Sequence, residues 1–138
     1  MMFPRFFAMA ERAWHSAKWQ VPYNYDGAKY TQDSGVFTDS LKAQRDQRWQ
    51  EFANIISQKE LLKLDKQGVF YRIPTVGAII SDGKLRANIA LPGLPIEYRV
   101  DGGSWQKYSG VVAVLGKVEV RARSADNKRA GRGLTVTQ

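Results

Sequence analysis

Apolar residues recur with a helical period at the beginning of the chain. At about 100° per residue, one set of them falls within an arc of about 120°, and Arg12 and Ser16 lie on the opposite side. The set comprises Phe3, Phe6, Phe7, Ala10, Ala13, Trp14 and Ala17. Pro4 suits the first turn, because it lacks the N–H group that a helix start leaves unpaired. The pattern predicts a helix over residues 3–17 whose aromatic stripe needs a packing partner, and we expect the chain to begin inside a larger fold.

A polar connection leads to a second helical region. Residues 18–38 are rich in Tyr, Gly, Asp and Ser and predict a long loop. Thr38 or Asp39 is suited to the N-cap of the next helix, because a short side-chain oxygen accepts a hydrogen bond from an unpaired N–H group of the first turn. The second helical region is therefore predicted to begin near residue 39.

The apolar face of this second region changes direction once. One face carries Trp49, Phe52, Ile55 and Ile56. Leu61 and Leu64 fall off that face, so one regular helix does not explain the pattern. Ser57 and Glu60 have the spacing of a capping box, which predicts that a new helix begins there. Gly68 is suited to the end of that helix, because glycine adopts the left-handed conformation readily.

The second half of the chain alternates between apolar and polar residues. One run places Ile96, Tyr98 and Val100 on one face, and another does the same with Val118, Val120 and Ala122. Turn signals at residues 82–83, 92–93 and 101–103 predict hairpins. Six or seven strands of this kind predict a small antiparallel, immunoglobulin-like β-sandwich, shorter than the usual domain of about 100 residues.

These patterns together predict an α+β fold. Residues 1–67 form the helical segment, residues 68–74 a connector and residues 75–138 the β-sandwich. Gly68 and Pro74 bracket the change from a helical period to a period of two.

Composition excludes several classes of protein. The chain has 43% apolar and 25% charged residues, which is typical of globular proteins. It has no cysteine, which excludes disulfides, thiol nucleophiles and cysteine-ligated zinc. No apolar run approaches the roughly 20 residues that span a bilayer, so we expect neither a signal peptide nor a membrane partner.

The net charge of +8 favours polyanionic partners in a general way. The basic residues are nevertheless dispersed from Arg5 to Arg132. Dispersed charge is typical of a solvated surface, and no nucleic-acid partner is expected. Polyanion binding remains a distant alternative.

The residues that usually carry catalysis are sparse. None of the 13 acidic residues neighbours another, and those on the helices, including Asp65, are interpreted as caps or local surface ion pairs. His15 is the single histidine, which excludes a histidine-rich metal site, and we expect it to be solvated. Neither glycine-rich phosphate-binding motif occurs. The sequence therefore predicts no catalytic residue, no metal ligand and no cofactor.

Two aromatic residues are weak candidates for carbohydrate contact. Trp105 and Tyr108 follow the turn at residues 101–103 and could present a face to a sugar ring. Core or cross-strand packing is the favoured interpretation, because aromatic residues are common in sandwich cores. The loop residues Tyr23, Tyr25 and Tyr30 are further candidates for binding chitin-like glycans.

The first 19 residues, MMFPRFFAMAERAWHSAKW, resemble the last barrel helix of family 20 glycoside hydrolases, the β-N-acetylhexosaminidases, and especially bacterial chitobiases. The elements FPR and AERAWH carry the resemblance. It continues through RWQEFANII, KELLKLDKQGVFYRIP and IALPGLPIEYRVDGGSW, and so covers nearly the whole chain.

The resemblance implies that the chain is the C-terminal end of an enzyme with a (β/α)8 barrel followed by an immunoglobulin-like domain. Such an enzyme removes terminal N-acetylglucosamine from chitobiose-like glycans. The acetamido oxygen of the substrate attacks the anomeric carbon, and an adjacent Asp–Glu pair assists. That pair and the substrate-lining residues of the family would precede Met1, so no functional residue of the family carries over.

A non-catalytic role in structure or docking follows from the resemblance, with a chitin-binding module as the alternative. The expected partner is the remainder of the barrel. A homo-oligomer formed through the helix over residues 3–17 is also expected, since an uncovered aromatic stripe favours association. The resemblance suggests the bacterial periplasm or cell envelope as the location.

Overall fold

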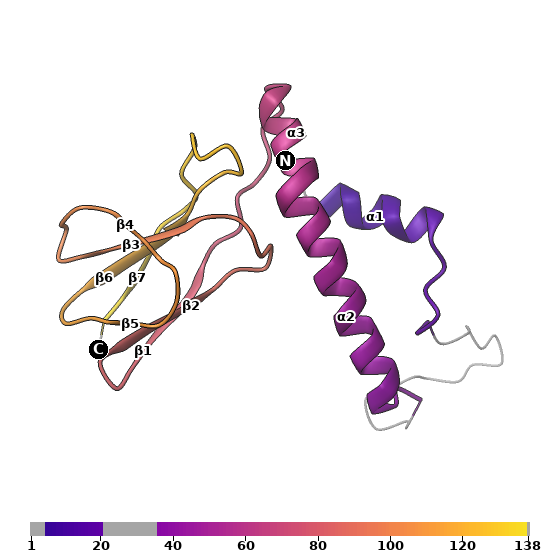
Figure 1. Cartoon of the computed structure of the whole chain (residues 1–138), viewed down its shortest axis with the longest axis horizontal. Helices are drawn as coiled ribbons and strands as arrows, with labels where there is room; N and C mark the ends of the chain where they lie inside the picture. Colours follow the sequence, from indigo (N-terminus) through magenta and orange to yellow (C-terminus); the bar gives the residue numbers. More distant parts are fainter. Residues whose placement is uncertain (1–4, 21–35, 138) are drawn as a thin grey trace.

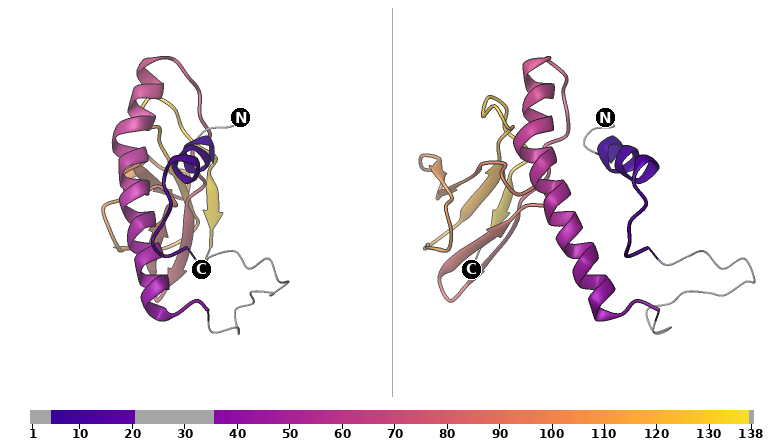
Figure 2. Two further views of the ribbon diagram at one scale, coloured as in Figure 1. Left: turned by 90° about the vertical axis from the view of Figure 1, so that its right-hand side faces the viewer. Right: turned by 45° about the vertical axis from the view of Figure 1, so that its right-hand side comes forward.

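The computed structural model describes residues 5–20 and 36–137. Helix α2 (Asp39–Ile55) lies between helix α1 (Arg5–Trp14) on one side and a β-sandwich on the other (Figures 1 and 2). The predicted α+β fold with a small antiparallel β-sandwich is confirmed.

Helix α1 is shorter than its periodicity predicts. It ends at Trp14, so the predicted end at Ala17 is wrong; residues 1–4 lie outside the described part of the chain. After the helix the chain turns back on itself. The Arg12 guanidinium donates a hydrogen bond to Gln20 Oε1 at 2.7 Å and lies 5.1 Å from the centre of the Trp19 ring. These contacts hold the chain in a turn where the pattern alone would continue the helix.

Helix α2 begins where its N-cap was predicted. The side-chain oxygen of Thr38 accepts a hydrogen bond from the backbone N–H of Leu41 at 3.3 Å. This bond satisfies one of the N–H groups that the first turn leaves unpaired. Of the predicted connection, residues 21–35 lie outside the described residues.

The predicted helix start at Ser57 is wrong. Helix α2 continues through a π-helical turn, η2 (Ile56–Glu60), into α3 (Leu61–Lys66). The N–H of Leu61 bonds to the carbonyl of Ile56, five residues back, and the extra residue in this turn rotates the apolar face by about 100°. The Ser57 hydroxyl oxygen lies 2.8 Å from the Ala53 carbonyl oxygen, one turn back in the same helix, and does not cap a helix. The predicted end at Gly68 is confirmed by its φ of 69°.

Two antiparallel sheets form the sandwich. The three-stranded sheet has the order β1-β2-β5, and the four-stranded sheet has the order β4-β3-β6-β7. The strands are β1 (Gly77–Ser81), β2 (Lys84–Asn88), β3 (Ile96–Val100), β4 (Gln106–Lys107), β5 (Val112–Ala113), β6 (Val118–Ala122) and β7 (Leu134–Val136). Within the described residues this makes seven strands, as the alternation predicts.

Two of the three predicted hairpins are confirmed. Asp82 and Gly83 both have positive φ and join β1 to β2, as a tight hairpin turn requires. The turn after Val100 joins β3 to β4. The predicted hairpin at residues 92–93 is wrong, because this turn connects β2 to β3, which belong to different sheets. A contact with the helix explains the position of the turn at residues 92–93: the Ser57 hydroxyl donates to the Pro92 carbonyl.

The core confirms the predicted alternation and extends beyond the strands. Tyr98 on β3 lies opposite Val120 on β6, and both side chains are buried. Helix residues belong to the same apolar cluster: Ala53 and Leu61 have no exposed surface, and Ile56 is 4% exposed. The helix and the sandwich therefore share one core.

Candidate functional site: the groove between α1 and α2

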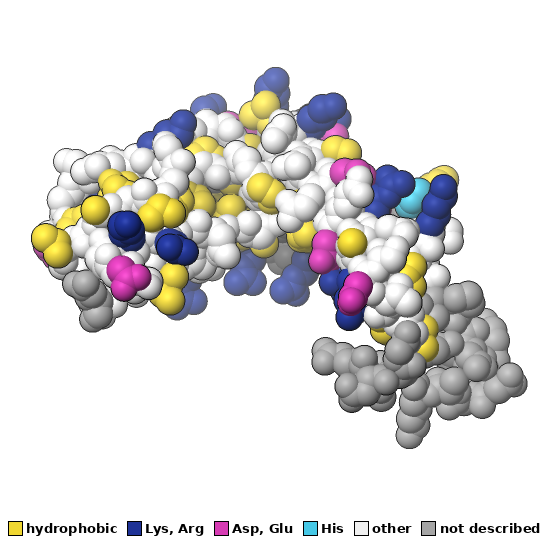
Figure 3. Space-filling model, turned by 60° about the horizontal axis from the view of Figure 1, so that its bottom comes forward, with side chains coloured by type: hydrophobic (Ala, Val, Ile, Leu, Met, Phe, Trp, Pro, Cys, Tyr) yellow, Lys and Arg dark blue, Asp and Glu magenta, His cyan; other side chains and the backbone are white. Residues whose placement is uncertain are grey.

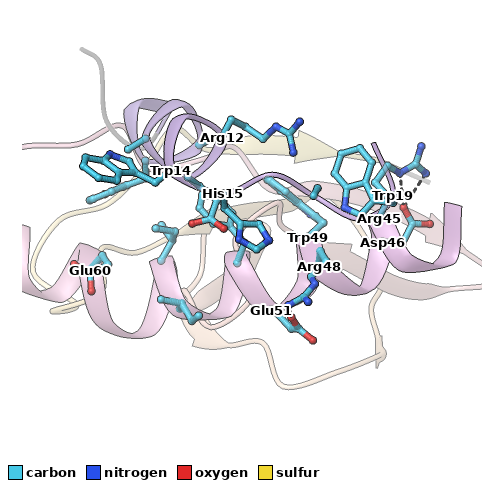
Figure 4. Close-up of a pocket in the computed structure, with 18 residues that line it drawn as sticks. Arg12, Trp14, His15, Trp19, Arg45, Asp46, Arg48, Trp49, Glu51 and Glu60 are labelled. Carbon is cyan, nitrogen blue, oxygen red and sulfur yellow. Dashed lines mark hydrogen bonds and ion pairs between the residues drawn. The ribbon is translucent and has the colours of Figure 1, made fainter. Parts of the chain in front are cut away.

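A groove with a volume of about 860 Å³ runs between α1 and α2 (Figure 4). Its apolar lining consists of Phe7, Ala8, Ala10, Trp14, Ala17, Trp19, Trp49, Phe52, Ile55 and Ile56. Its charged and polar lining consists of Glu11, Arg12, His15, Arg45, Asp46, Arg48, Glu51 and Glu60. The groove is thus an apolar channel bordered by charged side chains.

Helical spacing brings the apolar residues together. Phe7, Ala10 and Trp14 recur every three or four residues on α1 and therefore share a face. On α2, the rings of Trp49 and Phe52 lie 5.9 Å apart at an angle of 38°. Phe7 and Phe52 also pack against the buried core, so the groove continues the core to the surface.

The groove leaves much apolar surface uncovered. Trp14 is 92% exposed, Ile55 52% and Trp49 46%. Among the residues that the structure describes, ten large apolar side chains are exposed; six of them lie between residues 6 and 55, and three of these six line the groove. Concentrated apolar surface on a soluble domain usually marks an interface, so this groove is the strongest candidate for docking.

The charged border does not select a charged ligand. On α2 the Arg45 side chain pairs with Asp46 at 2.7 Å, and Arg48 pairs with Glu51 at 3.0 Å. These pairs are formed within the helix itself, which leaves burial of apolar surface as the main source of affinity for an occupant. His15 is exposed, as predicted.

Other kinds of site find no support in the described part of the chain. Over residues 5–20 and 36–137, no three metal-ligating side chains come together. No helix within those ranges has the length and apolarity to cross a membrane. On the face drawn in Figure 3, lysine and arginine side chains are dispersed from the sandwich to the helices.

Trp105 lies on the outer face of the four-stranded sheet. The Arg121 guanidinium lies 3.7 Å from the centre of its ring, and the Arg99 guanidinium lies 4.7 Å from it. Both arginines are held by cross-strand ion pairs, Arg121 with Glu97 at 2.5 Å and Arg99 with Glu119 at 2.8 Å. The ring is partly buried, and it packs against the arginines of these two ion pairs.

Tyr108 does not share that surface. Its ring packs against the core and contacts Tyr98 edge-on at 6.4 Å, and its hydroxyl accepts a hydrogen bond from the Ala87 N–H at 3.0 Å. The structure therefore does not bring Trp105 and Tyr108 together into one aromatic platform. The loop tyrosines Tyr23, Tyr25 and Tyr30 lie outside the described residues.

The prediction of Asp65 as a surface acid is wrong. Its side chain is 3% exposed and forms an ion pair with Arg129 at 3.0 Å. One signal could have indicated this, because an acid in the last turn of a helix opposes the helix dipole and needs compensation elsewhere. The compensating residue lies 64 positions away and leaves no mark in the local sequence.

Comparison with known families decides the identity. The sequence profile of the chitobiase/β-hexosaminidase C-terminal domain matches residues 60–133. This chain belongs to that family. The resemblance to the C-terminal part of family 20 hexosaminidases is thereby confirmed.

Relatives of this hexosaminidase C-terminal domain extend the match to both helices. The N,N′-diacetylchitobiase of Vibrio harveyi is 40% identical over 138 residues, which cover 99% of this chain and 15% of the relative. The β-hexosaminidase of Vibrio vulnificus is 37% identical over 142 residues, covering 99% and 17%. The β-hexosaminidase B of Pseudoalteromonas piscicida is 52% identical over 56 residues, covering 41% and 7%. The chain thus spans about a sixth of the length of the two relatives that match it throughout.

The groove and the Asp65–Arg129 pair lie in different parts of the matched sequence. Asp65 and Arg129 lie within residues 60–133, the span of the hexosaminidase C-terminal domain. All the groove residues except Glu60 precede that span, but the two Vibrio relatives match 99% of the chain. The groove therefore belongs to a segment shared with long hexosaminidases.

Proposed function

We propose that this chain is the non-catalytic C-terminal part of a β-N-acetylhexosaminidase, and that the α1–α2 groove docks on the remainder of that enzyme. The uncovered apolar groove is the observation that carries the proposal. The parent enzyme would release terminal N-acetylglucosamine from chitobiose-like glycans, in line with the name of the chitobiase relative.

The distribution of exposed apolar surface supports docking through the helices. Trp14, Trp49 and Ile55 would each contribute on the order of 1–2 kcal/mol when covered, at about 25 cal/mol per Å² of apolar surface. The relatives have most of their length outside the matched segment, so a partner of sufficient size is available within such an enzyme. The last helix of a barrel contributes packing, whereas active sites lie on the loops that follow the strands.

The acidic residues support a non-catalytic role. Substrate-assisted hydrolysis in this family depends on an adjacent Asp–Glu pair, and none of the 13 acidic residues neighbours another. Several acids on the helices form local ion pairs, such as Glu60 with Lys63 at 2.7 Å. We expect the isolated chain to release no nitrophenol from a nitrophenyl N-acetylglucosaminide, and measurable release would contradict the proposal.

A chimaeric enzyme tests docking directly. The matched C-terminal segment of the Vibrio harveyi protein would be replaced by this chain, which is 40% identical to it. We expect a soluble, active chimaera, and we expect Trp49→Asp or Ile55→Asp to reduce the soluble yield and hydrolysis together. Gln50→Asp, on the same helix but outside the groove, is the matched control. Groove variants as active as this control would sink the docking hypothesis.

Glycan binding is the second candidate function. Trp105 supports it, because its ring lies on the outer face of a sheet rather than in the core. Titration with chitin oligosaccharides should shift the indole N–H resonance of Trp105, and Trp105→Ala should abolish retention on insoluble chitin. An unchanged Trp105 resonance at millimolar oligosaccharide would remove this candidate.

Self-association is a further use of the same groove. A second copy would cover Trp14 and Trp49 in the absence of the remainder of the enzyme. Light scattering of the purified chain distinguishes the two cases. A dimer that dissociates in the Trp49→Asp variant supports self-association, and a monomer at all concentrations contradicts it.

A further inference from the structure

A buried carboxylate joins the helix to the sandwich. Asp65 Oδ1 accepts a hydrogen bond from Arg129 Nη2 at 3.0 Å. Asp65 Oδ2 accepts from the Tyr71 hydroxyl at 2.9 Å and from the backbone N–H of Asp126 at 3.1 Å. Since the side chain is 3% exposed, these bonds are shielded from water and hold the end of α3 against the loop between β6 and β7.

The segment between α3 and β1 is anchored by the same residues. Tyr71 is 1% exposed, and its hydroxyl accepts a hydrogen bond from the Ala125 N–H at 2.8 Å. Arg129 donates to the Tyr71 carbonyl at 3.3 Å and lies 5.0 Å from the centre of the Phe70 ring. The segment is thus held at Phe70 and Tyr71, its residues Ile73 and Val76 are buried, and it has little freedom to act as a flexible linker.

The loop between β6 and β7, which contacts Asp65, is held in place by hydrogen bonds of its own. The Ser124 hydroxyl donates to Asp126 Oδ1 at 2.6 Å and accepts from the Arg129 N–H at 2.9 Å. The Arg123 guanidinium donates to the Asn127 carbonyl at 2.7 Å. Movement of this loop would break these bonds, so the loop transmits the position of α3 to the sheet.

A second contact joins the helix and the sandwich at the π-helical turn. The Ser57 hydroxyl, in a residue that is 2% exposed, donates to the Pro92 carbonyl. Gly93 is the next residue in the chain and also lies close to the helix, because a Cβ atom there would lie 3.1 Å from Ser57 Oγ. Ser57 and Asp65 are eight residues apart, or about 12 Å along the helix axis. A body held at two such points can turn only about the line that joins them, and the core shared by the helix and the sandwich opposes that turn.

We infer that residues 53–137 form one rigid body, in which Asp65 and Ser57 clamp the β-sandwich at a fixed angle to the helix that forms the α2 wall of the groove. The sandwich is therefore a fixed extension of the continuous helix formed by α2, η2 and α3, and not a module carried on a flexible linker. Any surface of the sandwich, including that around Trp105, therefore keeps one position relative to the α2 wall of the groove. This inference concerns the isolated chain and does not depend on the proposed docking.

Distance measurements between spin labels test the clamp. The chain has no cysteine, so Gln44→Cys on α2 and Lys84→Cys on β2 introduce two labelling sites without background. We expect one narrow distance distribution in the doubly labelled protein. The added pair Ser57→Ala and Asp65→Ala should broaden it. Glu60→Ala, an acid between the two clamp residues whose partner is Lys63, is the matched control and should leave it narrow.

Two outcomes would overturn the inference. One is a broad distribution before any clamp residue is changed, and the other is a distribution that stays narrow in a folded clamp variant. If the clamp variant does not fold, ¹⁵N relaxation of the unaltered chain decides the question. A single rotational diffusion tensor for residues 53–137 supports the inference, and faster, independent tumbling of the sandwich contradicts it.

Discussion

The carboxylate of Asp65 and the guanidinium of Arg129 lie 3.0 Å apart, although 64 residues separate them in the sequence. One belongs to the last turn of α3 and the other to the loop between β6 and β7. The pair closes the fold of this hexosaminidase C-terminal domain around its connector. Its stability should therefore respond strongly to changes at either residue.

Removing Arg129 should destabilise the chain by about 2 kcal/mol. This lies below the range of about 3–5 kcal/mol for fully buried pairs, because the Arg129 side chain is 28% exposed. Urea unfolding measures the change. Lys128→Ala, at a neighbouring side chain that is 83% exposed, should alter stability by less than about 0.5 kcal/mol. The effects of Asp65→Ala and Arg129→Ala should add to more than that of the double variant, and strict additivity would contradict a coupled pair.

The stability of the chain should fall between pH 10 and 12. Burial raises the pKa of Tyr71 to about 12, so the folded chain retains a phenolic proton that the unfolded chain loses near pH 10. The unfolded state is therefore favoured as pH rises through this window, by on the order of 2 kcal/mol at its end. Lysines titrate over the same range, so the measured quantity is the difference in unfolding free energy between the unaltered chain and Tyr71→Phe. A difference that stays constant from pH 9 to 12 would refute the assignment.

Gly131→Ala should destabilise the chain by about 1–3 kcal/mol through overpacking. A Cβ atom at this position would lie 2.8 Å from Ile73 Cγ2 and 3.3 Å from the Ala122 carbonyl oxygen. Gly133→Ala is the matched control, because its nearest neighbour would be the Val120 carbonyl oxygen at 3.9 Å. Thermal unfolding of the two variants provides the comparison. Equal melting temperatures would show that the connector does not pack as tightly as described.

The groove and the core should respond differently to truncation. Trp14→Ala removes a side chain that is 92% exposed and should change the stability of the isolated chain by less than about 0.5 kcal/mol. Leu61→Ala removes a fully buried side chain and should cost about 3 kcal/mol. Urea unfolding of both variants tests the distinction. A large loss for Trp14→Ala would mean that the groove is closed in solution and does not await a partner.

Much of the secondary structure could be predicted, because it depends on neighbouring residues. Thr38 caps α2 through a bond to an N–H three residues away. The turn at Asp82 and Gly83 depends on two residues that accept positive φ. The alternation of β3 and β6 reflects the two-residue period of a strand, which one buried face is enough to reveal.

The candidate site could be predicted only in part. Periodicity indicates that the face of α1 carrying Phe7 and Trp14 needs a partner, but it does not identify that partner. The structure places this face beside Trp49 and Phe52 on α2, and the resulting groove has two walls from separate parts of the chain. Trp105 could not be assigned to the outer face from its type, since the position of an aromatic ring depends on strand register.

By itself the sequence determined the fold class, the strands over residues 96–100 and 118–122, the hairpin turns at residues 82–83 and 101–103, and membership of the hexosaminidase family. Only the tertiary structure decided the phase of the helix at Ile56–Glu60, the sheet change at residues 92–93 and the burial of Asp65. Each of these depends on a partner at least 30 residues away, as in the bond from Ser57 to Pro92, 35 residues on. Local preferences are set by neighbours in the chain, whereas these choices are set by which distant groups the shared core brings into contact.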